Sequence, residues 1–542
     1  MDNPPATKTS PARHPLVRLW PWLVVLLVLL FVGFIRVRLL EMPLERDEGE
    51  YAYAGQLLLQ GIPPYELAYN MKLPGTYFAY AAGMAVFGQT VSGIHLTLLV
   101  VNAVTIIFVF LLGRALSGTT AALVACASYG LMSTSTPVLG MAAHATQFVV
   151  LFAVPGTWLL WRALQTGRRE LLFLSGLLFG LAFVTKQQGM CFGIFGLGAL
   201  CWYEKKDLSG GHIRSSAPQI LFYVFGLALP FLAVCAGLAS AGVFPQFWFW
   251  TFTYAKTYAA GTGFAEGFNH LSDYLRDQFQ FFVGFWVLAV AGLMVALRNN
   301  TGQRQITFAM GFLLFSFLGT TPGLYFRQHY FVLVLPALAL IVGLAVEFLQ
   351  SGPARWGKVV PVLLLLGVIG WDVYLQRWAL FQLSPGRLSQ VIYGDNPMVE
   401  SQLVARYIRE HSPETARVAV IGSEPEIYFY ARRHSVTGYI YTYALMENQP
   451  FAVTMQQQMI REIESGKPDF LVLVVNRYSW LFKDSSDLEI FGWVKKYTAG
   501  HYERVGLVDV RAGKRGLQVW DKAVKTIQGD PEQYLAVYKR KP

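Results

Sequence analysis

Charged residues are scarce in this chain, and this scarcity excludes an ordinary soluble globular protein. Only 14% of the 542 residues are charged, whereas 54% are hydrophobic, and the mean hydropathy is +0.40. These values are typical of a polytopic membrane protein whose apolar surface faces lipid. Cysteine is also rare. The four cysteines lie in or beside apolar runs and have neither CxxC nor metal-ligand spacing. We therefore expect them to behave as small hydrophobic residues, and they do not indicate the redox compartment of the protein.

Several short motifs are absent as well. The C-terminal stretch contains neither GxGxxG nor GxxxxGK[ST], so no nucleotide site is predicted there. The net charge of +11 comes without a basic stripe or a recognition motif, which argues against a nucleic-acid partner. The first apolar run, 16–35, lacks a small-residue cleavage site and is long enough to span a bilayer. We therefore expect an uncleaved first helix.

Hydropathy predicts a transmembrane domain over residues 1–380 with about eleven spans. A further apolar helix at 75–88 begins after Pro74 and has only about 14 apolar residues. We expect it to lie at the outer interface, within an outer loop at 41–90. The predicted spans are 16–38, 91–113, 119–138, 145–163, 170–186, 189–203, 217–240, 278–297, 305–321, 329–349 and 357–376.

The loops between these spans predict the orientation. With a cytoplasmic N-terminus that carries Lys8, Arg13 and Arg18, every loop on the same side is basic, as the positive-inside rule requires. Those loops hold Arg114; Arg162, Arg168 and Arg169; Lys205, Lys206 and Arg214; Arg298 and Arg304; and Arg355 and Lys358. The sequence therefore predicts a multi-pass protein of a bacterial inner membrane. The charged and histidine residues discussed below would share its outer face.

The composition changes after Trp378, and residues 381–542 predict a soluble α/β domain. Apolar runs at 417–422 and 469–475 predict buried strands, and 397–411 and 451–465 predict flanking helices. An odd number of spans places this domain outside the cytoplasm.

Charged residues also follow apolar runs on the outer face, where charge is costly and usually functional. Arg46-Asp47-Glu48-Gly49-Glu50 follows the first span, Lys72 comes about 25 residues later, and Lys186 ends another apolar run. An alternative for Asp47 is a helix N-cap with Glu50 completing a capping box. Both lysines could instead snorkel to the interface.

Other residues on the outer face have structural alternatives too. His144 could be a satisfied polar residue, because it lies between small residues at the outer end of a span. The aromatic run 244–258 is typical of an interfacial belt.

Together the motifs resemble the dolichyl-phosphate-mannose-protein mannosyltransferase-like group of the glycosyltransferase-C superfamily, which includes the bacterial lipid A aminoarabinose transferases. The resemblance covers residues 16–350. It rests on Asp47-Glu48, Tyr51-Ala52, Lys72-Leu73-Pro74 with Tyr77, Phe87-Gly88, Gly180 to Lys186, His329-Tyr330-Phe331 and Leu335 to Leu340. It implies an inverting enzyme that passes a sugar from a polyprenyl-phosphate carrier to an acceptor on the outer face.

The resemblance also implies roles for individual residues. Asp47 would be the catalytic base that deprotonates the acceptor hydroxyl, with Glu48 as the second candidate. Lys72 and Lys186 would bind the donor phosphate, and Arg327, on the same face, is a further candidate for this role. The expected substrate-binding residues are Tyr51, Tyr77, His144, His329 and Tyr330.

The chain departs from the family pattern in three places. It has Leu73 where other members have proline and Glu50 where lipid A transferases have arginine, and 142–147 lacks the second acidic residue that many members carry. No metal ligand is therefore assigned, and these departures leave a divalent metal requirement open.

The chemistry agrees with the resemblance, because a polyprenyl phosphodiester leaving group needs cations beside it and an inverting displacement needs one base. The acceptor, whether glycan, lipid or protein, is not specified. Two other classes remain as alternatives: a transporter or flippase of lipid-linked sugars, and a non-catalytic glycolipid-binding scaffold.

Overall fold

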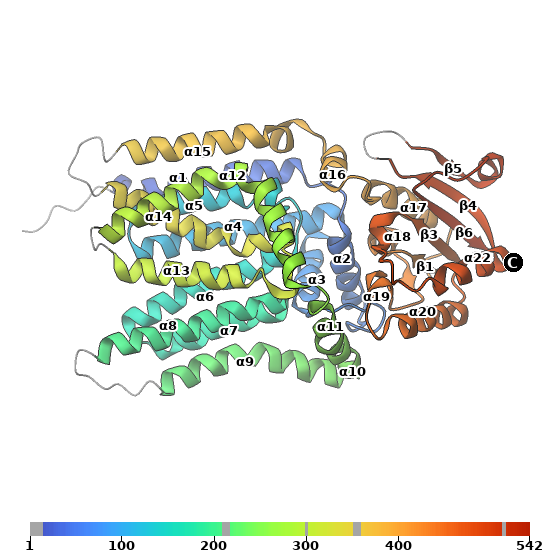
Figure 1. Cartoon of the computed structure of the whole chain (residues 1–542), viewed down its shortest axis with the longest axis horizontal. Coiled ribbons are helices and arrows are strands. Elements are labelled where there is room, and N and C mark those ends of the chain that lie inside the picture. The colour runs from blue at the N-terminus through green and yellow to red at the C-terminus, as the bar shows by residue number, and fades with distance from the viewer. Residues whose placement is uncertain (1–14, 209–216, 299–301, 351–358, 512–515) are drawn as a thin grey trace, which may run out of the picture.

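The computed structural model describes residues 15–208, 217–298, 302–350, 359–511 and 516–542. Of the basic residues that predicted the orientation, Lys8, Arg13, Arg214, Arg355 and Lys358 lie outside the described residues. A bundle of apolar helices forms one end of the molecule, and a sheet with its helices forms the other (Figure 1).

An apolar helix forms within every predicted span. The bundle contains α1 (Pro15–Arg38), α4 (Val91–Leu116), α5 (Thr119–Met132), α6 (Ala145–Thr166), α7 (Arg169–Thr185), α8 (Met190–Leu208), α9 (Ala217–Ser240), α12 (Phe264–Arg298), α13 (Gln303–Leu318), α14 (Leu335–Gln350) and α15 (Val360–Arg377).

Six helices among the described residues are long and apolar enough to cross a membrane, which confirms a helical, multi-pass protein. They are Leu19–Arg38, Val91–Leu116, Ala145–Thr166, Ala217–Ser240, Gln280–Arg298 and Val360–Gln382. The apolar helices Thr119–Met132 and Leu335–Gln350 are shorter.

Small residues let helices of the bundle pack closely. A Cβ atom at Gly176 of α7 would lie 2.2 Å from the carbonyl oxygen of Tyr223 in α9, and one at Gly226 of α9 would lie 2.2 Å from that of Phe173. Such contacts between backbones are typical of helix pairs in membranes.

Short helices lie between the bundle and the sheet (Figure 1). Helices α2 (Arg46–Leu59) and α3 (Gly75–Phe87) come from the loop after α1. Helix α3 has 13 residues, as expected for a helix too short to span. The loop after α9 supplies α10 (Phe244–Trp248), the π-helical η3 (Phe249–Tyr254) and α11 (Ala255–Ala259).

The C-terminal residues form one six-stranded mixed sheet in the order β2-β1-β3-β6-β4-β5. Strand β1 pairs in parallel with β2 and β3, and β6 pairs antiparallel with β3 and β4. The strands are β1 (Arg417–Ile421), β2 (His434–Ser435), β3 (Phe470–Val475), β4 (Tyr502–Asp509), β5 (Gln518–Trp520) and β6 (Tyr534–Arg540).

Strands β1 and β3 confirm the two predicted strands. The predicted helices also form, as α17 (Met398–Glu410) and α20 (Ala452–Gly466). The remaining helices of this region are α16 (Pro385–Tyr393), α18 (Glu426–Ala431), α19 (Tyr443–Met446), α21 (Arg477–Trp480) and α22 (Glu489–His501).

Candidate functional site

Helix α2 begins with a capping box that leaves Asp47 free. The side chain of Glu45 accepts the amide of Glu48 at 3.0 Å, and the carboxylate of Glu48 accepts the amide of Glu45 at 3.2 Å. The alternative in which Asp47 caps the helix with Glu50 is therefore wrong, because the box forms two residues earlier. The carboxylates of Asp47 and Glu50 are available for another partner.

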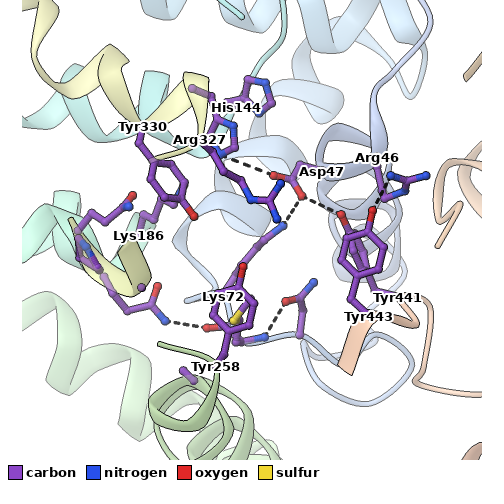
Figure 2. Close-up of a pocket in the computed structure, with 18 of the residues that line it drawn as sticks. Arg46, Asp47, Lys72, His144, Lys186, Tyr258, Arg327, Tyr330, Tyr441 and Tyr443 are labelled. Carbon is purple, nitrogen blue, oxygen red and sulfur yellow. Dashed lines mark hydrogen bonds and ion pairs between the residues drawn. The ribbon is translucent and has the colours of Figure 1, made fainter. Parts of the chain in front are cut away.

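That partner is Lys72. Its Nζ lies 2.8 Å from Oδ1 of Asp47 (Figure 2). The same atom lies 2.7 Å from Oε2 of Glu50. The hydroxyl of Tyr77 donates to Oε1 of Glu50 at 2.6 Å, and the ammonium lies 4.6 Å from the ring centroid of Tyr51. Both tyrosines are buried, and their contacts help to hold Lys72 and Glu50 in place.

Glycine brings the two lysine motifs together. A Cβ atom at Gly75 would lie 2.5 Å from the carbonyl oxygen of Val184, so only glycine permits this approach of α3 to the end of α7. The hydroxyl of Thr76 then donates to the carbonyl oxygen of Thr185 at 2.9 Å. The side-chain amide of Gln187 donates to the carbonyl oxygen of Met71 at 2.7 Å. These contacts place the Lys72 loop against Lys186.

The basic side chains of Lys186 and Arg327 lie beside aromatic rings. Lys186 lies 4.4 Å from the ring centroid of Tyr330, and the guanidinium of Arg327 lies 5.5 Å from that of Tyr325. Neither forms an ion pair with any carboxylate in the part of the chain that the structure describes. Two cations in this state favour a bound anion.

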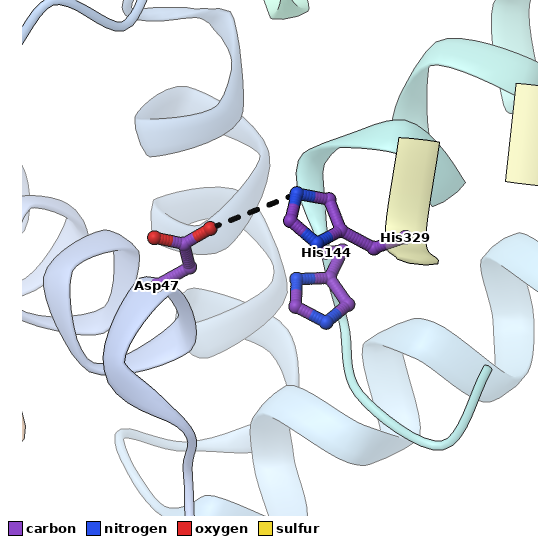
Figure 3. A group of neighbouring side chains, drawn as sticks. All are labelled: Asp47, His144 and His329. Atoms are coloured by element: carbon purple, nitrogen blue, oxygen red, sulfur yellow. Dashed lines mark ion pairs between the residues drawn. The ribbon is translucent and has the colours of Figure 1, made fainter. Parts of the chain in front are cut away.

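Two histidines stack beside Asp47 (Figure 3). The rings of His144 and His329 are 4.3 Å apart with an interplanar angle of 11°, and Nε2 of His329 lies 4.0 Å from Oδ2 of Asp47. Both histidines are buried. Neither ring nitrogen of His144 forms a hydrogen bond with any residue that the structure describes, although Nδ1 lies 3.4 Å from Glu45.

The same three residues fit a metal ion. One ligand atom from each of Asp47, His144 and His329 lies within 4.8 Å of the others. Two imidazoles and a carboxylate form a donor set that suits several divalent transition metals. The unpartnered nitrogens of His144 are consistent with such a site.

Glu48 faces away from this group. Its Oε1 accepts the amide of Ala143 at 2.6 Å and lies 3.3 Å from Nε2 of His95. The carboxylate thus joins α2 to α4 and to the start of α6.

A cavity of about 790 Å³ connects these side chains. Seven of the residues predicted from the sequence line it, whereas Glu48, Tyr51 and Tyr77 do not. The seven are Asp47, Lys72, His144, Lys186, Arg327, His329 and Tyr330.

Aromatic residues that the sequence did not predict as functional line the rest of the cavity. Trp250, Tyr254 and Tyr258 belong to the run expected to be an interfacial belt, whereas Tyr441 and Tyr443 come from the C-terminal region. The aromatic density of 244–258 was the one available signal. Aromatic faces of this kind can stack on a sugar ring.

The surroundings shift the pKa values in the cavity. Burial alone would raise the pKa of Asp47, but the charge of the Lys72 ammonium and its hydrogen bond to the carboxylate outweigh burial and hold this pKa well below its usual range. Burial lowers the pKa of His144 to about 4 and that of His329 well below its usual value. At neutral pH, Asp47 is therefore a carboxylate and both imidazoles are neutral.

Comparison with known sequences confirms the resemblance inferred above. Residues 72–234 match the family described as dolichyl-phosphate-mannose-protein mannosyltransferase. An undecaprenyl phosphate-alpha-4-amino-4-deoxy-L-arabinose arabinosyl transferase of Pseudomonas aeruginosa is 32% identical over 153 residues. This match spans 26% of the chain and about a quarter, 27%, of that relative.

Solved structures show the fold. ArnT from Cupriavidus metallidurans, bound to undecaprenyl phosphate, has a TM-score of 0.59 at 15% identity and covers 96% of this chain and 98% of its own. The oligosaccharyltransferase of Archaeoglobus fulgidus, in complex with Zn and sulfate, has a TM-score of 0.54 at 13% identity. This match covers 93% of the present chain and 74% of the oligosaccharyltransferase. The chain shares the fold of these glycosyltransferases.

Proposed function

We propose that this chain, whose residues 72–234 carry the pattern of the dolichyl-phosphate-mannose-protein mannosyltransferase family, is a membrane glycosyltransferase. It moves a sugar from a polyprenyl-phosphate carrier to an acceptor at the outer face of the membrane, with inversion at the anomeric carbon. One observation carries the proposal. A deprotonated Asp47 lines the same cavity as Lys186 and Arg327, two basic side chains that have no carboxylate partner among the described residues.

Asp47 acts as the general base in this reaction. Its Oδ1 is bonded to Lys72, so Oδ2 is the oxygen that accepts the proton of the acceptor hydroxyl. The acceptor oxygen then attacks the anomeric carbon on the face opposite the phosphate, and the bond from that carbon to the phosphate oxygen breaks. One displacement of this kind inverts the configuration.

The cations stabilise the leaving group. The polyprenyl phosphate gains negative charge as the carbon–oxygen bond breaks, and Lys186 and Arg327 are placed to balance that charge. Lys72 keeps Asp47 ionised through their 2.8 Å contact. A direct contact of Lys72 with the phosphate remains a proposal.

His329, His144 and Tyr330 line the same cavity as Asp47 and Lys186 and would contact the sugar. Tyr51 and Tyr77 would act indirectly, because they contact Lys72 and Glu50 and do not line the cavity. Glu48 would have a structural role.

The donor lipid is proposed from the relatives. One is named for undecaprenyl phosphate as its sugar carrier, and one solved neighbour holds undecaprenyl phosphate. We therefore propose an undecaprenyl-type carrier for this chain. The acceptor is a glycan, a lipid or a protein.

Asp47, His144 and His329 would hold a divalent metal if one binds. Such an ion would supply positive charge beside Asp47, on the side from which the acceptor hydroxyl would approach. Metal analysis of the purified protein, compared with a His144→Ala variant, tests this: bound metal that is lost in the variant supports the site.

The proposed topology has eleven crossings, a cytoplasmic N-terminus and two domains, 1–380 in a bacterial inner membrane and 381–542 outside it. Three features support this arrangement. Helix α3 is too short to span. Arg162 near the end of α6, Arg168 in the turn that follows and Arg169 at the start of α7 lie at the end of the bundle opposite the cavity. Helices α2 and α3 lie at the same end as the sheet (Figure 1).

The experiment is transfer by the purified protein in detergent, where no gradient exists. Conversion of a polyprenyl-phosphate sugar to free polyprenyl phosphate and a glycosylated acceptor is the expected result. A transporter, a flippase or a glycolipid-binding scaffold would bind the donor and leave it intact.

A further inference from the structure

A tyrosine from the C-terminal region contacts the proposed base. The hydroxyl of Tyr441 donates to Oδ1 of Asp47 at 3.3 Å, although 394 positions separate the two residues in the chain (Figure 2). The ammonium of Lys72 lies 5.6 Å from the centroid of the Tyr441 ring. Tyr441 therefore lies over the Asp47–Lys72 pair on the side of the sheet.

Neighbouring residues fix the position of Tyr441. Its ring packs edge-on against that of Tyr443, with centroids 4.8 Å apart and an interplanar angle of 86°. The hydroxyl of Tyr443 donates to the carbonyl of Tyr478 and accepts a bond from the guanidinium of Arg46, each at 2.7 Å.

Arg46, the residue before Asp47, is bound to the same region. Its guanidinium lies 3.0 Å from Glu424, donates to Asn396 at 3.1 Å and also bonds the carbonyl of Ser423. The side chain is buried, with 7% of its surface exposed. The start of α2 is thus fixed by contacts with residues that follow the bundle.

We propose that Tyr441 is a positioning residue for Asp47 and that the C-terminal region therefore completes the catalytic site. This inference rests on the proposed function. Oδ1 of Asp47 has two donors, the ammonium of Lys72 and the hydroxyl of Tyr441, which together fix the rotation of the carboxylate. Oδ2 is then held toward the cavity, where the acceptor hydroxyl would lie.

The first test is Tyr441→Phe, which removes only the hydroxyl. We expect kcat to fall about tenfold, in line with the loss of one hydrogen bond to a charged group, while the KM values for donor and acceptor stay unchanged. Tyr439→Phe is the matched control. Its hydroxyl, in the same segment, bonds Gln458 at 2.9 Å, and Tyr439 does not line the cavity.

The second test asks whether Tyr441 acts through Asp47. In an Asp47→Asn background, adding Tyr441→Phe should leave the residual rate unchanged, because the carboxylate that the hydroxyl positions is gone. A purely structural role would give the same fold-loss in both backgrounds. Thermal unfolding of each variant is recorded, and the kinetics are measured well below each midpoint.

The outcomes are distinguishable. No transfer by the wild-type protein would overturn the proposed function itself. If the wild-type protein is active, a wild-type kcat for Tyr441→Phe, a raised KM at unchanged kcat, or an equal loss in the Asp47→Asn background would each overturn the positioning role.

Discussion

Lys186 is a side chain of the cavity whose charge should respond to pH near neutrality. Burial, together with Lys72 and Arg327, lowers its pKa to about 7 despite the opposing effect of Asp47. The donor is a phosphodiester that stays singly negative, and its binding favours the charged amine. Below about pH 7 the amine is already protonated, so donor affinity should not depend on pH.

Above about pH 7, donor binding must take up a proton. The dissociation constant for a polyprenyl-phosphate sugar should then rise about tenfold per pH unit, because each unit of pKa corresponds to a factor of ten. The measurement is a binding titration in detergent without acceptor, so that the donor is not consumed. In Lys186→Arg the cation is permanent and the affinity should be independent of pH. A flat profile for the wild-type protein would contradict the proposal that Lys186 binds the phosphate with a pKa near neutrality.

Some site residues could be predicted from the sequence and others could not. Asp47, Lys72 and Lys186 stand out because they are charges beside apolar runs, where solvation is poor. Tyr441 and Tyr443 carry no such signal, since tyrosine is ordinary in a β-rich region and their contacts with Asp47 and Arg46 depend on tertiary structure. Glu48 could not be separated from Asp47 until the capping geometry was visible.

At the scale of the element, the two adjacent carboxylates at the start of α2, Asp47 and Glu48, have different roles. Glu48 closes the capping box and bonds the amide of Ala143, whereas Asp47 lines the cavity. Glu48→Gln should lower the free energy of unfolding by about 1–3 kcal/mol, because a buried charged hydrogen bond is lost, and should keep kcat within a few fold. Thermal unfolding and transfer rates, measured on the same preparation, check both parts. If the Glu48→Gln protein is stable but inactive, Glu48 takes part in accepting the proton of the acceptor, which would contradict a purely structural role.

The elements themselves were predicted well where lipid-facing residues dominate. The differences lie at helix ends, where local chemistry overrides hydropathy. Helix α5 ends at Met132, well before position 138, since a turn through Ser133 and a 3₁₀ turn at Thr136–Val138 follow it. Helix α14 begins at Leu335, because Gln328–Leu333 forms a separate 3₁₀ turn that presents His329.

Helix α12 begins 14 residues before its predicted span. Its first turns are amphipathic and contain Glu266, so hydropathy alone could not detect them. Strands β4 to β6 were not predicted, because they carry more polar residues than β1 and β3 and include an irregularity between Arg504 and Gly506.

At the scale of the whole molecule, the account requires the cavity and the C-terminal sheet to lie outside the cytoplasm. Cysteines introduced at Gln60 and Ser485, both exposed, should be labelled by an impermeant reagent in intact spheroplasts. A cysteine at Arg168, in the loop between α6 and α7, should react only after permeabilisation. The background replaces the four native cysteines with alanine.

The control for this experiment is transfer activity of the cysteine-free protein, which shows that the bundle is intact. Labelling at Arg168 together with protection at Ser485 would mean that the molecule is inserted the other way. The acceptor would then have to be cytoplasmic.

The most direct test of the account is the transfer rate of purified Asp47→Asn beside the wild-type protein, with a defined polyprenyl-phosphate sugar. The substitution keeps the shape of the side chain and removes the base. We expect wild-type turnover with an inverted product, and a rate about 10² to 10⁴ lower in the variant, with donor binding retained. Equal rates for the two proteins would contradict the assignment of Asp47 as the base.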